Sequence, residues 1–333
     1  MSLYRVWILV VSHLLLATAA VRADYPQNPL LINDSVYVSQ QGVYRFDRNQ
    51  SEPLWSSLSG IQTFAPVVFE NRLLVGSTRG LYALDLESGA IVWQIEEKRT
   101  LFTPSISTQA YAGSVHGELY AIDPRDGAID WRRQFNGWIY SPAISEGPGL
   151  LWSGGQAHEI YAVNIDDGAL RRQLATTQEA VFSPVELDAG EIAFNLFDGS
   201  TWLLGSTGTD DIEKLPGDSQ PNSVHAYLDT IYRSHRDGTL SAFARRDRKP
   251  RWRRSLTPQD LVMHPAQPGY LLLGDNDQTL LLLDLGQADT LCAVEVDGQW
   301  VLPLQLEDRK ILYFQRTVQP PGLTLVQTEA NCK

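Results

Sequence analysis

Residues 62–99, QTFAPVVFENRLLVGSTRGLYALDLESGAIVWQIEEKR, contain one complete structural unit. Four short runs rich in β-branched and aromatic residues (67–69, 73–75, 81–86 and 90–95) are separated by turn residues such as those around Gly80 and Gly89. This pattern predicts a four-stranded antiparallel meander. A sheet of this size cannot bury both of its faces alone, so it requires similar sheets on either side.

The unit recurs along the chain. The FAP sequence ending at Pro66 returns with Pro104, Pro142 and Pro184, and weaker copies are centred on Pro29, Val224, Pro265 and Pro303. The third run, Gly-Leu-Tyr-Ala-Leu-Asp from Gly80, is repeated at matching places. A period of about 40 residues is typical of propellers. The sequence therefore predicts an all-β fold, an eight-bladed β-propeller of four-stranded antiparallel blades, with seven blades as the alternative.

A tryptophan follows the third run at a constant distance of eight residues. Trp55, Trp93, Trp131 and Trp252 occupy this place, whereas Arg172, Glu213 and Cys292 replace it in the other repeats. A large indole on an outer strand can wedge between neighbouring blades, and its burial removes roughly 150–250 Å² from water. We therefore predict that the four tryptophans dock one blade onto the next.

The segments 83–93 and 121–131 both read Ala-x-Asp-x-x-x-Gly-x-x-x-Trp. In this motif the chain resembles the quinoprotein-like β-propellers with tryptophan-docking repeats. Their quinone-dependent alcohol dehydrogenases are longer and carry an adjacent cysteine pair, which is missing from this sequence. In length the chain is more similar to the family of periplasmic propeller subunits of the outer-membrane β-barrel assembly machinery. That resemblance implies a cofactor-free scaffold that holds a partner domain through loops on one face.

The first 23 residues have the features of an export signal. Arg5 precedes an apolar run, and Val21-Arg22-Ala23 fits a cleavage site before Asp24. The run is too short for a membrane span, which needs about 20 apolar residues. No cysteine follows it, so the lipid-anchor signal is missing. We predict a cleaved signal peptide at 1–23 and a soluble, exported, periplasmic protein that is not a lipoprotein, with one propeller domain at 24–333.

The formal net charge of −12 becomes more negative when the signal and its arginines are removed. An acidic surface repels nucleic acid and anionic membranes, so nucleic-acid binding is disfavoured. The chain also lacks the GxSxG, HExxH and Walker motifs of common enzymes. These features favour a monomeric, non-catalytic ring without a cofactor.

The two cysteines, Cys292 and Cys332, both belong to the predicted mature chain. In an oxidising compartment, a disulfide between them would attach the C-terminus to the adjacent blade. Two free thiols are the alternative. The last repeat also stops early, so either residues 24–28 complete the final blade or that blade has three strands.

One face of the predicted ring collects the loops before the first strand and between the second and third strands. The candidate partner-binding residues on it are Arg79, His116, Trp138, Tyr140, His158 and Phe182. The alternative for the aromatic residues is that they wedge between the inner strands. A second candidate is the arginine-rich outer strand with Arg251, Arg253 and Arg254, which could attract an acidic protein or anionic lipid headgroups. Its alternative is a solvated edge strand.

Two functions remain open at this point. The first is a periplasmic scaffold that binds a protein partner in the cell envelope, with a role in outer-membrane protein assembly. The second is a small redox propeller that binds a quinone, or a metal near His116 and His158.

Overall fold

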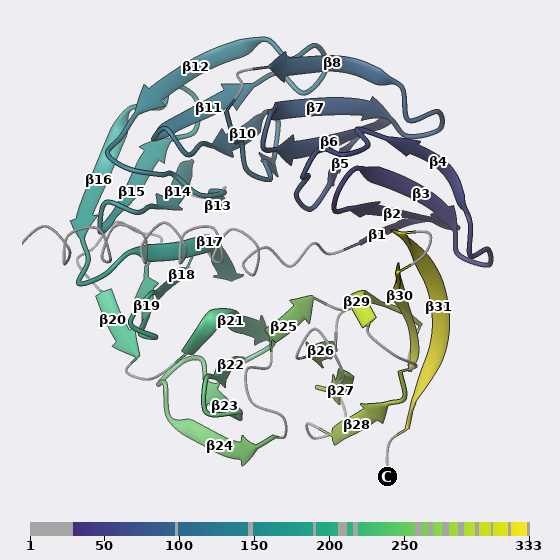
Figure 1. The fold of residues 1–333 in the computed structure, drawn as a ribbon. Helices are drawn as coiled ribbons and strands as arrows, with labels where there is room; N and C mark the ends of the chain where they lie inside the picture. Colours follow the sequence, from purple (N-terminus) through teal and green to yellow (C-terminus); the bar gives the residue numbers. More distant parts are fainter. Residues whose placement is uncertain are drawn as a thin grey trace, which may run out of the picture.

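The computed structural model describes residues 29–96, 99–145, 149–188, 191–205, 212–215, 219–256, 262–265, 269–274, 280–285, 290–296, 300–307, 309–318 and 321–331. The predicted signal peptide and residues 24–28 lie outside these ranges. Within them every regular element is a β-strand. Figure 1 shows the sheets arranged in a ring, with the first and last sheets side by side. The all-β propeller prediction is confirmed.

The first half of the ring contains four antiparallel meanders. Blade 1 is β1 (Leu30–Ile32), β2 (Ser35–Ser39), β3 (Val43–Asp47) and β4 (Pro53–Ser57). Blade 2 is β5 (Val67–Phe69), β6 (Arg72–Ser77), β7 (Gly80–Asp85) and β8 (Ile91–Glu96). Blade 3 is β9 (Ser105–Ile106), β10 (Ala110–Gly113), β11 (Glu118–Ile122) and β12 (Ile129–Gln134). Blade 4 is β13 (Ala143–Ser145), β14 (Leu150–Gly154), β15 (Glu159–Asn164) and β16 (Leu170–Ala175).

The second half continues the pattern. Blade 5 is β17 (Ala180–Asp188), β18 (Glu191–Leu196), β19 (Thr201–Leu204) and β20 (Ile212–Leu215). Blade 6 is β21 (Ser219–Tyr227), β22 (Thr230–His235), β23 (Thr239–Ala244) and β24 (Pro250–Ser255). Blade 7 is β25 (Val262–Pro265), β26 (Tyr270–Gly274), β27 (Leu280–Asp284) and β28 (Thr290–Val294). The last repeat forms β29 (Trp300–Glu307), β30 (Lys310–Val318) and β31 (Pro321–Asn331).

The number of complete blades is seven, which is the alternative count, rather than eight. The eighth repeat supplies three strands, and its last strand β31 pairs with β28, so blade 7 and this three-stranded unit share one seven-stranded sheet. The prediction of eight four-stranded blades is therefore wrong for the eighth blade, which has three strands.

The core lies between the blades. Apolar side chains from the second and third strands of one blade face those of the next, as in the cluster that joins Leu74 and Ala83 of blade 2 to Ala112 and Tyr120 of blade 3. The ring closes in the same way. Side chains from β2 and β3 pack against β30 and β31, and the ring centroids of Phe46 and Phe314 are 5.2 Å apart. The described contacts between the first and last sheets are therefore side-chain packing.

Candidate functional site

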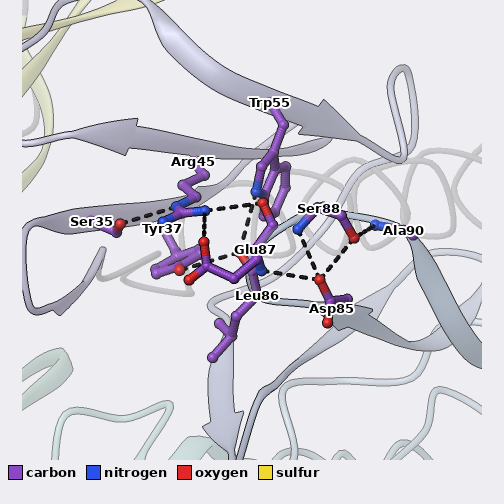
Figure 2. A network of polar contacts seen from close by, with 9 residues as sticks. All are labelled: Ser35, Tyr37, Arg45, Trp55, Asp85, Leu86, Glu87, Ser88 and Ala90. Carbon is purple, nitrogen blue, oxygen red and sulfur yellow. Dashed lines mark hydrogen bonds and ion pairs between the residues drawn. The ribbon is translucent and has the colours of Figure 1, made fainter.

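Trp55 of β4 contacts the β7–β8 turn of the next blade, as Figure 2 shows. Its indole Nε1 donates a hydrogen bond to the carbonyl oxygen of Leu86 at 3.2 Å, and the Tyr37 hydroxyl donates to the same oxygen at 3.3 Å. Arg45 Nη1 donates to the carbonyl oxygen of Glu87 at 3.0 Å and to its carboxylate at 2.6 Å. Blade 1 is therefore joined to blade 2 by several directional bonds.

The receiving turn is held by hydrogen bonds and has no side chain at the point of contact. The Asp85 carboxylate accepts hydrogen bonds from the Ser88 hydroxyl and from the backbone N–H groups of Ser88 and Glu87 (Figure 2). The Ser88 hydroxyl is the main cause of the lowered pKa of Asp85. Gly89 has φ +69°, and a Cβ there would lie 2.6 Å from Cε3 of Trp55. The turn therefore requires glycine both because the backbone has a positive φ and because a Cβ would overlap the indole.

The next two junctions repeat this arrangement. Trp93 Nε1 donates to the carbonyl oxygen of Pro124 at 3.1 Å, and a Cβ on Gly127 would lie 2.8 Å from the Trp93 ring. At the third junction, Trp131 Nε1 donates to the carbonyl oxygen of Ile165 at 3.2 Å. A Cβ on Gly168 would lie 2.7 Å from the Trp131 ring. We call this unit, an indole bonded to the carbonyl after the third strand and packed on the turn glycine, the tryptophan dock.

A β-bulge orients each docking tryptophan. In blade 2, Ala83 pairs with Trp93 but Leu84 pairs with Ile91, so Val92 is an extra residue on the outer strand. The same register shift occurs at the corresponding place in blades 1, 3, 4 and 6. A bulge bends its strand and increases the local twist. The described pairings of blades 5 and 7, which have Glu213 and Cys292 in place of tryptophan, show no such shift.

The junction between blades 5 and 6 replaces the dock with an ion pair. Glu213 stands at the tryptophan position, and Arg248 stands where the dock has its glycine, with φ 56°. Arg248 Nε donates to Glu213 Oε2 at 2.8 Å, and its Nη2 forms an ion pair with Glu191. Both positions of this contact therefore hold residues that differ from those of the dock.

The other predicted docking positions use other contacts. Trp252 is half-buried in an apolar cluster that includes Leu271 and Leu283 of blade 7, and the guanidinium of Arg254 lies 4.5 Å from its ring centroid. Cys292 at the equivalent place in blade 7 has no exposed surface and is disulfide-bonded. Its predicted partner, Cys332, lies outside the described residues.

The turns between the second and third strands all lie on one face of the ring, because every blade has the same strand order. We call this the 2–3 face. Arg79, His116 and His158 lie in these turns in blades 2, 3 and 4, and all three are exposed. Among the described residues, their side chains have no hydrogen-bond or ion-pair partner. The structure therefore places these three predicted residues on one face, with free polar groups.

The acidic groups of the same face are already engaged. Glu118 is buried, and its carboxylate accepts a bond from Arg99 Nη1 at 2.9 Å and one from the Tyr120 hydroxyl at 2.6 Å. In blade 4 the hydrogen bond from the Tyr161 hydroxyl lowers the pKa of Glu159. The imidazoles of His116 and His158 are consequently free polar groups in these two turns.

The predicted aromatic residues belong mostly to the interior. Tyr140 is buried and stacks on Phe102, with ring centroids 5.4 Å apart, and Phe102 stacks on Phe64 at 5.6 Å. Trp138 is half-buried against this ladder. The aromatic residues thus follow the alternative, that of wedges between inner strands. Phe182 lies in β17, and its side chain is outside the described part.

Sequence reasoning did not include Phe197, which is 46 % exposed in the β18–β19 turn of the 2–3 face. The available signal was an aromatic residue directly before the Asp198-Gly199 turn, a place that polar residues usually occupy. An exposed aromatic on the same face as exposed Arg79, His116 and His158 gives this face the mixed composition that protein-binding surfaces prefer.

The arginine-rich strand β24 is paired within its own blade. Arg251 forms an ion pair with Asp229, and Arg253 Nη2 lies 2.7 Å from Asp237 Oδ2. Arg254 covers Trp252 as described above. These contacts support a charged edge strand that stabilises its own blade.

In the described part of the chain, no group of three or more His, Cys, Asp or Glu side chains is arranged to hold a metal ion. No helix among these residues has the length and hydrophobicity needed to cross a membrane.

These features define a β-propeller whose blades are joined by tryptophan docks. A family model described as "Outer membrane protein assembly factor BamB" matches residues 14–95 and 99–210, which is more than half of the chain. The chain belongs to this family, as its docking repeats predicted.

Solved structures agree with the fold. BamB from Moraxella catarrhalis is similar over 90 % of this chain and 96 % of its own, with a TM-score of 0.69 and 14 % identity. A computationally designed protein, Ika8, is similar over 90 % of this chain and 95 % of its own, with a TM-score of 0.71 and 12 % identity. A comparison with curated proteins found no match.

Proposed function

We propose that this protein is a non-catalytic periplasmic scaffold that binds a protein partner during outer-membrane protein assembly. The observation that carries the proposal is the match to the assembly-factor family, which covers blades 1 to 4 and most of blade 5. The three tryptophan docks lie in the same part of the chain. They give a rigid frame, and a rigid frame binds a partner with little loss of conformational entropy.

The 2–3 face is the part of the frame that we propose for binding. Arg79, His116 and His158 project free polar groups there, and Phe197 adds exposed apolar surface. Serine hydroxyls hold two of these turns: the Ser77 hydroxyl accepts from the N–H of Arg79 at 3.0 Å, and the Ser114 hydroxyl accepts from the N–H of His116 at 3.2 Å. Arginine and aromatic side chains are common among the residues that contribute most to binding in protein interfaces.

Site-specific photo-crosslinking in living cells tests this proposal. A photoreactive residue at His158 should form crosslinks to a component of the outer-membrane β-barrel assembly machinery. The control is the same residue at Asp166, an exposed position in the β15–β16 turn on the opposite face of the same blade. Crosslinks to that machinery from Asp166 alone would contradict the choice of face, and none from either position would contradict the choice of partner.

A deletion strain gives the matching cellular test. Loss of the gene should lower the amount of folded outer-membrane β-barrel proteins, and the wild-type chain should restore it. An Arg79→Glu chain should restore less, because the free guanidinium is replaced by a carboxylate on the binding face. Normal levels of these proteins in the deletion strain would refute a role in assembly.

A further inference from the structure

A cluster of charged side chains lies on the 2–3 face of blade 3. The Glu118 carboxylate stands at the start of β11, and its side chain is only 8 % exposed. Arg99 Nη1 lies 2.9 Å from Oε2 of this carboxylate, and Arg132 Nη1 lies 3.4 Å from Oε1. The Tyr120 hydroxyl also donates to Oε2, at 2.6 Å. One buried carboxylate therefore holds two guanidinium groups.

Blade 4 has the same pair of a tyrosine and a glutamate without the arginines. The Tyr161 hydroxyl donates to Glu159, and Gln173 Nε2 donates to Glu159 Oε1 at 2.6 Å. The strand pairing gives Gln173 in blade 4 the place of Arg132 in blade 3. Because a neutral amide is sufficient there, the two arginines of blade 3 bring more positive charge than the buried carboxylate requires.

The two guanidinium groups of blade 3 are accessible to a ligand. The side chains of Arg99 and Arg132 are 40 % and 54 % exposed. A guanidinium has five N–H donors in a planar fork that fits a carboxylate. Apart from Glu118, the side chain of Arg132 has no hydrogen-bond or ion-pair partner in the described part of the chain. Its outer N–H groups are therefore available.

The segment that carries Arg99 joins two neighbouring turns of the face. On one side the N–H of Leu101 donates to the carbonyl oxygen at the end of β6, at 3.0 Å. On the other side the carbonyl oxygen of Thr100 accepts from the turn after β10, at 3.3 Å. These turns carry exposed Arg79 and His116. We call the set of neighbouring cationic and imidazole groups the basic strip, which consists of Arg79, Arg99, His116 and Arg132.

The charge of the basic strip is opposite to that of the whole chain. Three guanidinium groups and the Glu118 carboxylate leave an excess of two positive charges among these described side chains, whereas the formal net charge of the chain is −12. A positive region on an acidic protein attracts a negatively charged partner. A flat anionic membrane would also meet the acidic remainder of the surface, so these charges favour a short acidic segment.

We propose that the basic strip binds a segment of the partner protein that is rich in aspartate and glutamate. Carboxylates of this segment accept charge-assisted hydrogen bonds from Arg79 and Arg132, while Glu118 holds Arg132 in position. The inference rests on the proposed function for the choice of the 2–3 face, and it adds the chemical class of the segment that this face binds.

Binding of a fluorescent oligoglutamate peptide to the full chain tests the proposal, with an oligoglutamine peptide of equal length as the reference. The glutamate peptide should bind at low ionic strength and more weakly as salt is added, and the glutamine peptide should not bind. Arg132→Gln should weaken binding about fivefold. Its melting temperature should stay near that of the wild type, because Gln173 fills the same place in blade 4.

Arg171→Gln is the matched control. It removes the same charge from an exposed arginine at the β-bulge of blade 4, whose side chain also has no hydrogen-bond or ion-pair partner among the described residues. This variant should bind the glutamate peptide as the wild type does. Equal weakening by both variants would overturn the site, because it would show attraction by overall charge alone.

Two further outcomes would overturn the proposal. Equal binding of the glutamate and glutamine peptides would contradict recognition of carboxylates. Tighter binding to phosphatidylglycerol vesicles than to the glutamate peptide, lost in Arg132→Gln, would assign the basic strip to lipid headgroups instead. These measurements use no component of the assembly machinery, so their failure leaves the proposed function standing, and an absence of crosslinks in cells leaves the peptide result standing.

Discussion

The junctions in blades 1 to 4 and those in the later blades join the same kind of sheet by different chemistry. In the first half, an indole bonds to a carbonyl and packs on a glycine three times in succession. In the second half, Glu213 with Arg248 and the disulfide of Cys292 occupy the corresponding places of blades 5 and 7, and Trp252 of blade 6 packs in an apolar cluster with blade 7. The comparison teaches that the repeat motif can fade while the junction persists, because other side chains form the contact at the same positions.

The largest difference should come from removing an indole. Trp93→Ala should lower the free energy of unfolding by about 3–5 kcal/mol, because it empties a buried site and leaves the Pro124 carbonyl without its donor. Denaturant unfolding measures this value. Gln94→Ala, at the exposed next position of the same strand, is the matched control and should cost little. A similar small cost for both variants would show that the dock does not hold the blades together.

The platform glycine should be the next most sensitive position. Gly127→Ala combines φ +80° with a Cβ 2.8 Å from the Trp93 ring, whereas Gly60→Ala meets a similar φ of +77° with no atom within 4 Å. Gly60→Ala should cost about 1 kcal/mol from backbone strain, and Gly127→Ala about 2 kcal/mol more from overlap. In a Trp93→Ala background that extra cost should disappear. Thermal or chemical unfolding of Gly127→Ala and Gly60→Ala, each with and without Trp93→Ala, gives the coupling free energy between Gly127 and Trp93. Additive costs would argue against a direct contact.

The ion pair should matter less and depend on salt. Glu213→Gln should destabilise the protein by about 1 kcal/mol or less, since the Glu213 side chain is 46 % exposed. The loss should shrink as ionic strength rises. Glu87→Gln is the counterpart in the first half, where the Trp55 dock remains, and it should have the smaller effect. Unfolding at low and high salt decides this, and a salt-independent loss at Glu213 would point to packing instead of charge.

The smallest predicted effect is a pH dependence in blade 6. Burial lowers the pKa of His225, so the folded protein binds this proton less readily than the unfolded chain does. Stability should therefore fall as the pH drops below about 6.5, the unfolded value, and should not change above it. His225→Gln should remove part of this fall between pH 7.5 and 5.5. The lowered pKa of Asp85 acts in the same direction but below about pH 4. Equal pH profiles for wild type and variant would contradict the assignment.

Periodicity made the blades predictable. The apolar runs, the Asp-x-x-x-Gly turns and the spacing of Trp55, Trp93 and Trp131 carry local information that is visible in a single sequence. The predicted number of blades failed at the last repeat, because that number depends on how β31 pairs with β28. The strand β28 ends 27 residues before β31 begins. Such long-range pairing leaves no local pattern.

The candidate site was predictable only in part. The exposed positions of Arg79, His116 and His158 followed from the strand order. The sequence leaves open whether Tyr140 is exposed for binding or wedged inside, because its burial depends on contact with an aromatic residue 38 positions earlier, Phe102. The partnership of Glu213 with Arg248 also joins two blades, and it becomes visible only when the register of both is known.

Native-state amide hydrogen exchange tests the central comparison most directly. If three successive docks make the first half the more firmly joined part, the second and third strands of blades 2 and 3 should exchange more slowly than those of blades 5 and 6. Trp93→Ala should then abolish the difference between blade 2 and blade 5. Equal protection in both halves of the wild type, or slower exchange in blades 5 and 6, would contradict the account.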